Sequence, residues 1–119
     1  MTKYVVNAVS LNMFRLPEKG ETQISLLVKP LTTSEFCSEL GDAVSAVGHA
    51  STVELINGVC GSNISVSRVS VSLSSSDELV VVQVLKRLPE GKVLDYSEVK
   101  EMLEQGMIKF YKVVVTVSE

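Results

Sequence analysis

The sequence has few of the residues that build metal sites and disulfide frameworks. A single histidine, His49, occurs among 119 residues, so one chain cannot form a metal site from several histidines or a histidine dyad. Two cysteines are too few for a disulfide framework. Cys37 and Cys60 both stand among apolar residues at helical spacing, and we expect buried free thiols in preference to a bridge.

Positive charge is also scarce. The chain carries 11 Lys and Arg residues against 14 Asp and Glu residues, a net charge of −3, and its densest basic point is the pair Lys86 and Arg87. Proteins that bind long DNA or RNA usually have a basic surface, because neutralising phosphates provides most of their affinity. We therefore expect no long nucleic acid as a partner, whereas a small ligand with few phosphates is compatible with this composition.

Long apolar runs and common cofactor motifs are absent. No run of 18 or more apolar residues occurs, so no segment has the length of a membrane-spanning helix, and the start MTKYVVNAVSLNMF does not resemble a signal peptide. We expect a cytoplasmic protein without a membrane partner. The sequence also lacks a P-loop, a Rossmann fingerprint, zinc-ligand spacing and a Gly-x-Ser-x-Gly elbow, so we expect no cofactor and no metal.

The apolar pattern predicts a single α+β domain over residues 1–119. Capping boxes at Thr32 and Ser51, and a similar start at Asp95, predict three helices that end near Gly41, Gly61 and Gly106. The segment 79–85 is almost entirely apolar, which is typical of a central strand. Strands are predicted over residues 3–9, 23–29, 67–73, 79–85 and 109–117. The expected fold is a mixed five-stranded sheet flanked by about three helices.

Polar residues gather where the first predicted strand ends. Asn7, Ser10 and Asn12 lie in the segment NAVSLNM. Asn and Ser commonly bond the local backbone in a strand-end turn. The same side chains are also suited to binding a ribose or a base, and both interpretations stay open on the sequence.

A second polar group, Gly48, His49 and Ser51, stands just before the second predicted helix. A surface histidine near a helix start would explain it. A helix N-terminus also presents N–H groups that favour a phosphate, and an imidazole beside a phosphate can protonate a leaving oxygen. Placement thus makes a functional role for His49 plausible without establishing it.

A third group lies at the exit of the predicted central strand. Gln83 and Arg87 interrupt apolar surroundings, and Glu90 belongs to a Pro-Glu-Gly turn. An arginine at a strand end can form a two-pronged pair with a phosphate. A solvated strand exit followed by a turn would explain the same residues.

Five segments, taken together, resemble one protein family. They are NAVSLNM, AVGHASTVELINGVCG, VSRVSV, QVLKRLPEGKVL and EQGMIKFYKV. In order and spacing they are similar to small proteins of crenarchaeal viruses that act as type III anti-CRISPR ring nucleases, a family long known as a domain of unknown function. The resemblance covers nearly the whole chain and is weakest over residues 14–42. Its most specific parts are the Gly-His-x-Ser-Thr block and the block around Arg-Leu-Pro-Glu-Gly-Lys.

The resemblance implies a homodimeric enzyme that binds cyclic tetra-adenylate, the second messenger of type III CRISPR effectors. Members cut the ring without metal, by attack of a ribose 2′-OH on the adjacent phosphate. The products are linear di-adenylates with 2′,3′-cyclic phosphate ends, and loss of the messenger leaves the ancillary defence nucleases inactive. A loop over residues 14–20 is expected to close over the ring.

The resemblance also implies roles for particular residues. By position His49 matches the general acid, Arg87 a phosphate-contacting arginine and Glu90 an essential glutamate. Substrate-binding residues are expected at Asn7, Ser10, Asn12, Gly48, Ser51 and Gln83.

One departure from the family pattern stands after the last helix. Members often place a lysine directly after the glycine there, but here Gly106 is followed by Met107, and the nearest lysine is Lys109.

Two other functions also stay open. The chain would fit a protein that binds a cyclic oligonucleotide without cutting it, or a nucleic-acid-binding regulatory dimer.

Overall fold

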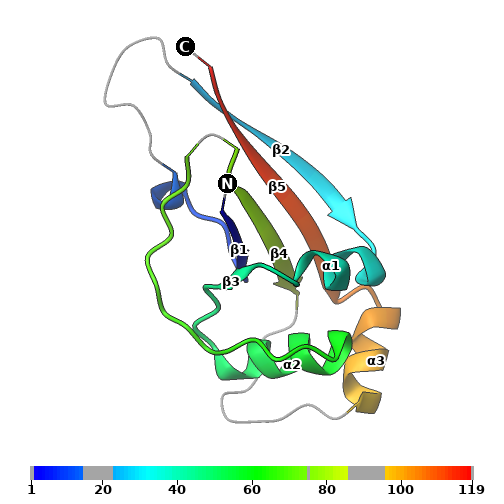
Figure 1. Cartoon of the computed structure of the whole chain (residues 1–119). Helices are drawn as coiled ribbons and strands as arrows, with labels where there is room; N and C mark the ends of the chain where they lie inside the picture. Colours follow the sequence, from blue (N-terminus) through cyan, green and yellow to red (C-terminus); the bar gives the residue numbers. More distant parts are fainter. Residues whose placement is uncertain (1, 15–22, 75, 86–95, 119) are drawn as a thin grey trace.

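The computed structural model describes residues 2–14, 23–74, 76–85 and 96–118. These residues form one α+β domain with a single mixed sheet and three α-helices, as expected (Figure 1). The strands are β1 (Lys3–Val6), β2 (Gln23–Leu31), β3 (Val44–Ser45), β4 (Glu78–Val84) and β5 (Ile108–Ser118). The helices are α1 (Thr33–Glu39), α2 (Ala50–Cys60) and α3 (Tyr96–Glu104), with a short 3-10 turn η1 (Leu11–Met13). None of the helices among the described residues is long and apolar enough to cross a membrane.

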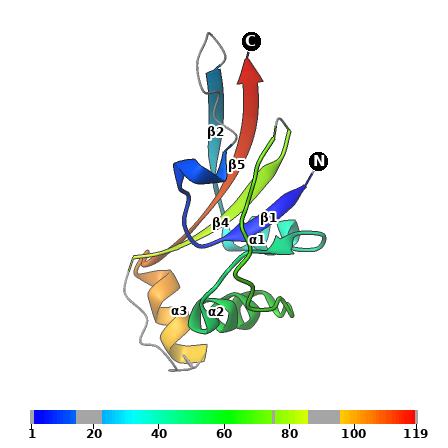
Figure 2. The same cartoon turned by 90° about the vertical axis from the view of Figure 1, so that its left-hand side faces the viewer.

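The sheet has the order β2-β5-β4-β1-β3, so β4 lies at its centre, as its apolar sequence predicts. β1 runs parallel to both β4 and β3, whereas β5 is antiparallel to β4 and to β2. β2 and β5 extend together beyond the rest of the sheet as a two-stranded arm (Figures 1 and 2).

The sheet separates two apolar clusters. The cluster on the helix side joins the sheet to α1, α2 and α3, and within it the rings of Phe36 and Phe110 stack with centroids 4.3 Å apart. Among the described residues, no α-helix covers the cluster on the opposite side. There Phe14, Val71 and Leu73 pack over the sheet from the chain around η1 and from the segment that precedes β4.

The start of α1 confirms the predicted capping box. Thr32 Oγ1 accepts a hydrogen bond from the Glu35 amide at 3.1 Å, and Glu35 Oε1 accepts one from the Thr32 amide at 2.9 Å. α1 ends at Glu39, two residues before Gly41. The predicted start of the third helix at Asp95 lies outside the described residues, and Gly106 follows that helix with a φ of 71°.

The strand predicted over residues 67–73 is wrong. This segment makes one isolated bridge, between Leu73 and Phe14, and joins no strand of the sheet. Its alternating pattern has a different cause, because Val71 and Leu73 are buried as a cover over the sheet, whereas Val69 is 49% exposed. The fifth strand is β3, which has only two residues and is too short for an alternating pattern to reveal.

β2 continues past the point where the sequence predicted its end. The predicted strand ends at residue 29, before Pro30, whereas β2 runs on to Leu31. Because β2 is an edge strand, a residue without an N–H group can lie in it without breaking an interior ladder of hydrogen bonds.

The expectation of free thiols is also wrong, because Cys37 and Cys60 form a disulfide. Cys37 lies in α1 and Cys60 is the last residue of α2, and the packing of these helices brings their Cα atoms to 5.2 Å. That separation suits a disulfide. Composition argues against a bridge, and only the packing of α1 against α2 brings together two cysteines that are 23 residues apart in the chain.

Candidate functional site

Three of the predicted site segments meet at one edge of the sheet. β1, β3 and β4 are parallel, so their carboxyl ends lie at the same edge, where open α/β sheets usually bind ligands. Asn7 directly follows β1 and is partly buried, and Gly48 and His49 follow β3. Val6 pairs with Val81 of β4, and Gln83 lies two residues further along that strand with an exposed side chain.

His49 is the residue that precedes α2, and its imidazole is exposed. Its backbone is extended, with φ −118° and ψ 122°, and its carbonyl accepts the first helical hydrogen bond, from the Val53 amide at 3.1 Å. The side chain makes no capping hydrogen bond. The imidazole therefore stands beside the amino end of a helix without being used to hold that helix.

The capping box predicted at Ser51 and Glu54 is wrong. The helix begins one residue before Ser51, at Ala50, so Ser51 lies in the first turn and is partly buried. The pattern Ser-x-x-Glu matches a capping box by spacing alone, whereas the extended backbone that a cap requires falls at His49. Ser51 thus stays next to the helix N-terminus, as a predicted substrate-binding residue.

α2, which begins directly after His49, packs against the core of the domain. Thr52, Val53, Leu55 and Ile56 are buried, and the helix ends at Gly61, whose φ is 63°. After the helix, Asn57 organises the returning chain: its Nδ2 donates to the Ile64 carbonyl at 3.1 Å, and its Oδ1 accepts from the Ile64 amide at 3.0 Å. The chain then runs back along α2 toward the start of that helix (Figure 1).

The returning chain brings a residue to the site that the sequence did not indicate. Arg68 Nε donates a hydrogen bond to the Gly48 carbonyl at 3.2 Å, and the neighbouring Ser67 amide donates to the Val47 carbonyl at 2.9 Å. Arg68 lies in the segment 67–73, which the sequence predicts as a strand and not as part of a site. Its position beside His49 depends on a contact between residues 20 apart in the chain, which no local pattern reports.

Ser10 and Asn12 are brought together with each other but not with His49. Ser10 Oγ donates to Asn12 Oδ1, and both side chains are exposed around η1. η1 is bonded to the segment 67–73 that covers the sheet, because the Leu73 amide donates to the Met13 carbonyl at 2.8 Å. In both views this turn lies well apart from the start of α2 (Figures 1 and 2).

Two of the three predicted catalytic residues, Arg87 and Glu90, lie outside the described residues, as do residues 15–20 of the expected closing loop. Met107, which stands where the family often has lysine, packs partly buried against the helix-side cluster. Lys109 is exposed and pairs with Gln83 across β5 and β4.

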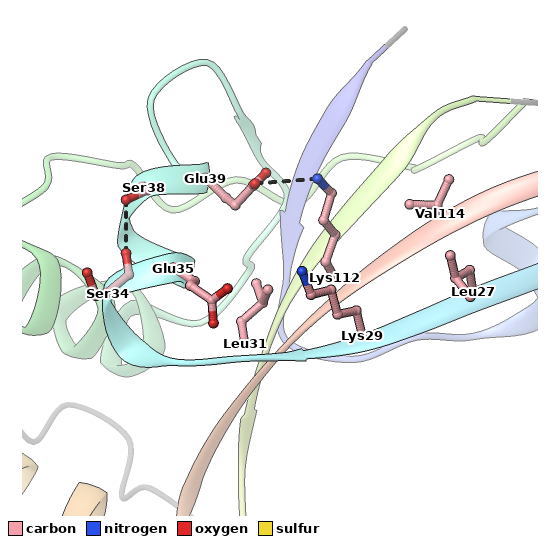
Figure 3. A pocket seen from close by; sticks show the side chains of 9 residues that line it. All are labelled: Leu27, Lys29, Leu31, Ser34, Glu35, Ser38, Glu39, Lys112 and Val114. Atoms are coloured by element: carbon pink, nitrogen blue, oxygen red, sulfur yellow. Dashed lines mark hydrogen bonds and ion pairs between the residues drawn. The ribbon is translucent and has the colours of Figure 1, made fainter.

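A separate cavity of about 370 Å³ lies between α1 and the β2–β5 arm (Figure 3). Lys112 Nζ lies 3.4 Å from Glu39 Oε1 and 2.9 Å from Glu78 Oε1, and Lys3 Nζ lies 2.9 Å from Glu39 Oε2. The hydrogen bond with Lys3 and the charge of Lys112 lower the pKa of Glu39, and the hydrogen bond with Glu78 raises the pKa of Lys112. Opposite charges are therefore paired within this network, and it ties α1 to β1, β4 and β5.

Comparison with known proteins places this fold among virus proteins. B116 of Sulfolobus turreted icosahedral virus has a solved structure that matches with a TM-score of 0.84 and 33% identity, over 96% of this chain and 99% of B116. The uncharacterized protein 26 of Sulfolobus islandicus filamentous virus is 30% identical over 95 residues, 78% of this chain and 80% of the relative. The uncharacterized protein ORF116 of Acidianus filamentous virus 1 is 46% identical over 70 residues.

The match to ORF116 covers 59% of this chain and 60% of that relative, less than two thirds of its length. A family model described as STIV B116-like matches residues 3–111, which includes every predicted site residue. The chain therefore belongs to the STIV B116-like family.

Proposed function

We propose that this protein is a metal-independent ring nuclease that binds and cleaves cyclic tetra-adenylate, and so switches off type III CRISPR ancillary defence. The observation that carries the proposal is the position of the only histidine. The imidazole of His49 is exposed beside the N-terminus of α2, at the carboxyl edge of three parallel strands. A helix N-terminus favours a phosphate, and an imidazole next to it is suited to proton transfer.

The proposed reaction needs little from the protein beyond alignment and one proton. The 2′-oxygen of a ribose attacks the adjacent phosphorus and its proton passes to solvent water, the bond from phosphorus to the 5′-oxygen breaks, and His49 gives its proton to that 5′-oxygen. The products carry a 2′,3′-cyclic phosphate and a 5′-hydroxyl. Holding the three reacting atoms in line can lower the barrier by up to about 7–11 kcal/mol, and general acid catalysis contributes roughly 10²–10⁴-fold.

Two further described residues support a ligand site at this edge of the sheet. Asn7 directly follows β1, and the exposed Gln83 lies near the end of β4. The roles of Arg87 as a phosphate contact and of Glu90 as an essential carboxylate rest on the resemblance alone. Arginine near the phosphate would stabilise the charge that develops during attack.

We further propose that two copies share one ring, because each chain supplies a single histidine. A two-fold axis would place one His49 on each side of the ring and yield two dinucleotides. Val66 and Val69 flank Arg68 beside the His49 site and are 48% and 49% exposed. They give this region an apolar surface that a second copy would cover.

The primary test is incubation of the protein with labelled cyclic tetra-adenylate in EDTA, with cyclic hexa-adenylate in parallel. The expected products are linear di-adenylates with 2′,3′-cyclic phosphate ends. Intact ring after long incubation with excess protein would contradict a nuclease. Tight binding in that case would instead favour a protein that sequesters the ring.

The role of His49 is tested by His49→Ala, with Glu54→Ala, an exposed residue of the same helix, as the matched control. We expect His49→Ala to bind the ring with unchanged affinity and to cut it at least roughly 100-fold more slowly. Glu54→Ala should cut at the wild-type rate. Undiminished turnover by His49→Ala would remove the imidazole from the mechanism.

Two copies per ring are tested by mass and by mixing. Light scattering should report twice the 12.9 kDa of one chain. Heterodimers of wild type and His49→Ala should make one cut per bound ring, so that linear tetra-adenylate accumulates before di-adenylate. A monomeric mass in the presence of the ring would contradict the shared site.

A further inference from the structure

Three consecutive carbonyl groups hold the chain that leads into α2. The Val47 carbonyl accepts from the Ser67 amide at 2.9 Å, and the His49 carbonyl accepts from the Val53 amide at 3.1 Å. Between them, the Gly48 carbonyl accepts from Arg68 Nε at 3.2 Å. Two of these bonds join backbone groups and depend on no side chain, whereas the bond to Gly48 depends on the side chain of Arg68.

The same contact explains why position 48 is glycine. Gly48 does not have the positive φ that marks Gly61, so its backbone conformation does not require glycine. A Cβ on Gly48 would instead lie 2.9 Å from Arg68 Cγ, closer than such atoms approach in proteins. Cγ is near the base of the side chain, so an alanine here would displace Arg68 and break its bond to the carbonyl.

We propose that Arg68 is a positioning residue for His49, acting through the Gly48 carbonyl that it holds. The clamp fixes the peptide that directly precedes His49, and therefore fixes the direction in which the imidazole leaves the backbone. The contribution of Arg68 lies in the N–H at the Nε position, not in the charge of the guanidinium. The catalytic consequence of this clamp rests on the proposed function, whereas its structural consequence does not.

Two substitutions separate the N–H donor from the charge. Gln has its amide nitrogen the same number of bonds from the backbone as Arg Nε, so Arg68→Gln keeps a donor at that position and loses the charge. Lys has a carbon at that position and its ammonium donor one bond further out, so Arg68→Lys keeps the charge and moves the donor away from the position of Nε. The two variants therefore make opposite predictions for a clamp and for a simple electrostatic role.

The first readout is structural and needs no nuclease activity. Because His49 is the only histidine, its ring Cε1–Hε1 pair gives a single, unambiguous NMR resonance. We expect Arg68→Gln to leave this resonance at its wild-type position and Arg68→Lys to move or broaden it. Identical spectra for all three proteins, equal changes in both variants, or a change confined to Arg68→Gln would each overturn the proposal.

The second readout is turnover of cyclic tetra-adenylate. We expect Arg68→Lys to lower kcat roughly 10- to 100-fold with little change in KM, because misplacement of a reacting group costs about this much. Arg68→Gln should keep most of kcat. A loss confined to Arg68→Gln would show that charge matters and would overturn the clamp. If the wild type has no activity, the proposed function fails, and the NMR comparison still decides the clamp.

A double-mutant cycle tests the glycine. Gly48→Ala should move the His49 resonance in the wild-type background, because the new Cβ displaces Arg68. In an Arg68→Ala background the same substitution should have no further effect, since nothing is left to displace. Additive changes in the two backgrounds would show that Gly48 and Arg68 act independently, and would overturn the coupling.

Discussion

Breaking the disulfide between Cys37 and Cys60 should lower the stability of the protein by a calculable amount. The bridge closes a loop with a sequence separation of 23 residues. The chain-entropy relation for a loop of that length gives about 3.4 kcal/mol at 25 °C. Because a domain of this size shifts its melting temperature by about 3–5 °C per kcal/mol, the expected loss is roughly 10–17 °C.

The assay compares the melting of oxidised and reduced protein by circular dichroism. A phosphine reductant breaks the bridge without changing the sequence, and thiol titration in denaturant confirms the two states. The variant Cys37→Ala/Cys60→Ala is the control, since its melting temperature should not respond to the reductant. Both cysteines are partly buried against the helix-side cluster, so this variant also loses some packing and should melt slightly below the reduced wild type.

Two results would refute this reasoning. Two free thiols per chain in the unreduced protein would show that the bridge does not form. Equal melting temperatures before and after reduction would contradict the entropic account, in which reduction gives the unfolded chain more freedom. They would show that the unfolded chain already constrains this loop without the bridge.

Two further substitutions test the polar contacts on which the fold depends. Asn57→Ala removes the hydrogen bonds with Ile64 and Ser62 and should cost about 2–3 kcal/mol in denaturant unfolding, whereas Ser62→Ala removes only the hydrogen bond from Ser62 Oγ to Asn57 Oδ1 and should cost about 1 kcal/mol. Equal losses would contradict this. The folded chain lowers the pKa of Glu39 below its ordinary value of 4.5, so its stabilisation is present above that pH and is lost as pH falls through the folded pKa. Glu39→Gln should therefore be less stable than wild type near neutral pH and lose less stability in acid. Curves of unfolding free energy against pH that run parallel for the two proteins would contradict a stabilising role for the ion pairs of Glu39.

Local patterns predicted much of the secondary structure of this protein. The capping box at Thr32, the apolar central strand and the glycines after α2 and α3 report local preferences, and the structure confirms each one. Local patterns misled where two causes produce the same sequence. Alternation over residues 67–73 fits a strand or a cover segment equally well, and Ser-x-x-Glu at Ser51 fits a cap that the backbone places at His49.

The candidate site also combines features that local sequence predicts with features that only tertiary packing decides. Residue chemistry and the family resemblance were enough to single out His49, and position relative to a predicted helix was enough to place it near a helix N-terminus. The contact of Arg68 with Gly48 and the bridge from Cys37 to Cys60 join residues 20 and 23 apart. Such contacts depend on how helices and returning chain pack against the sheet. Periodicity and capping signals carry information over only a few residues, so pairings at this range are decided by tertiary packing.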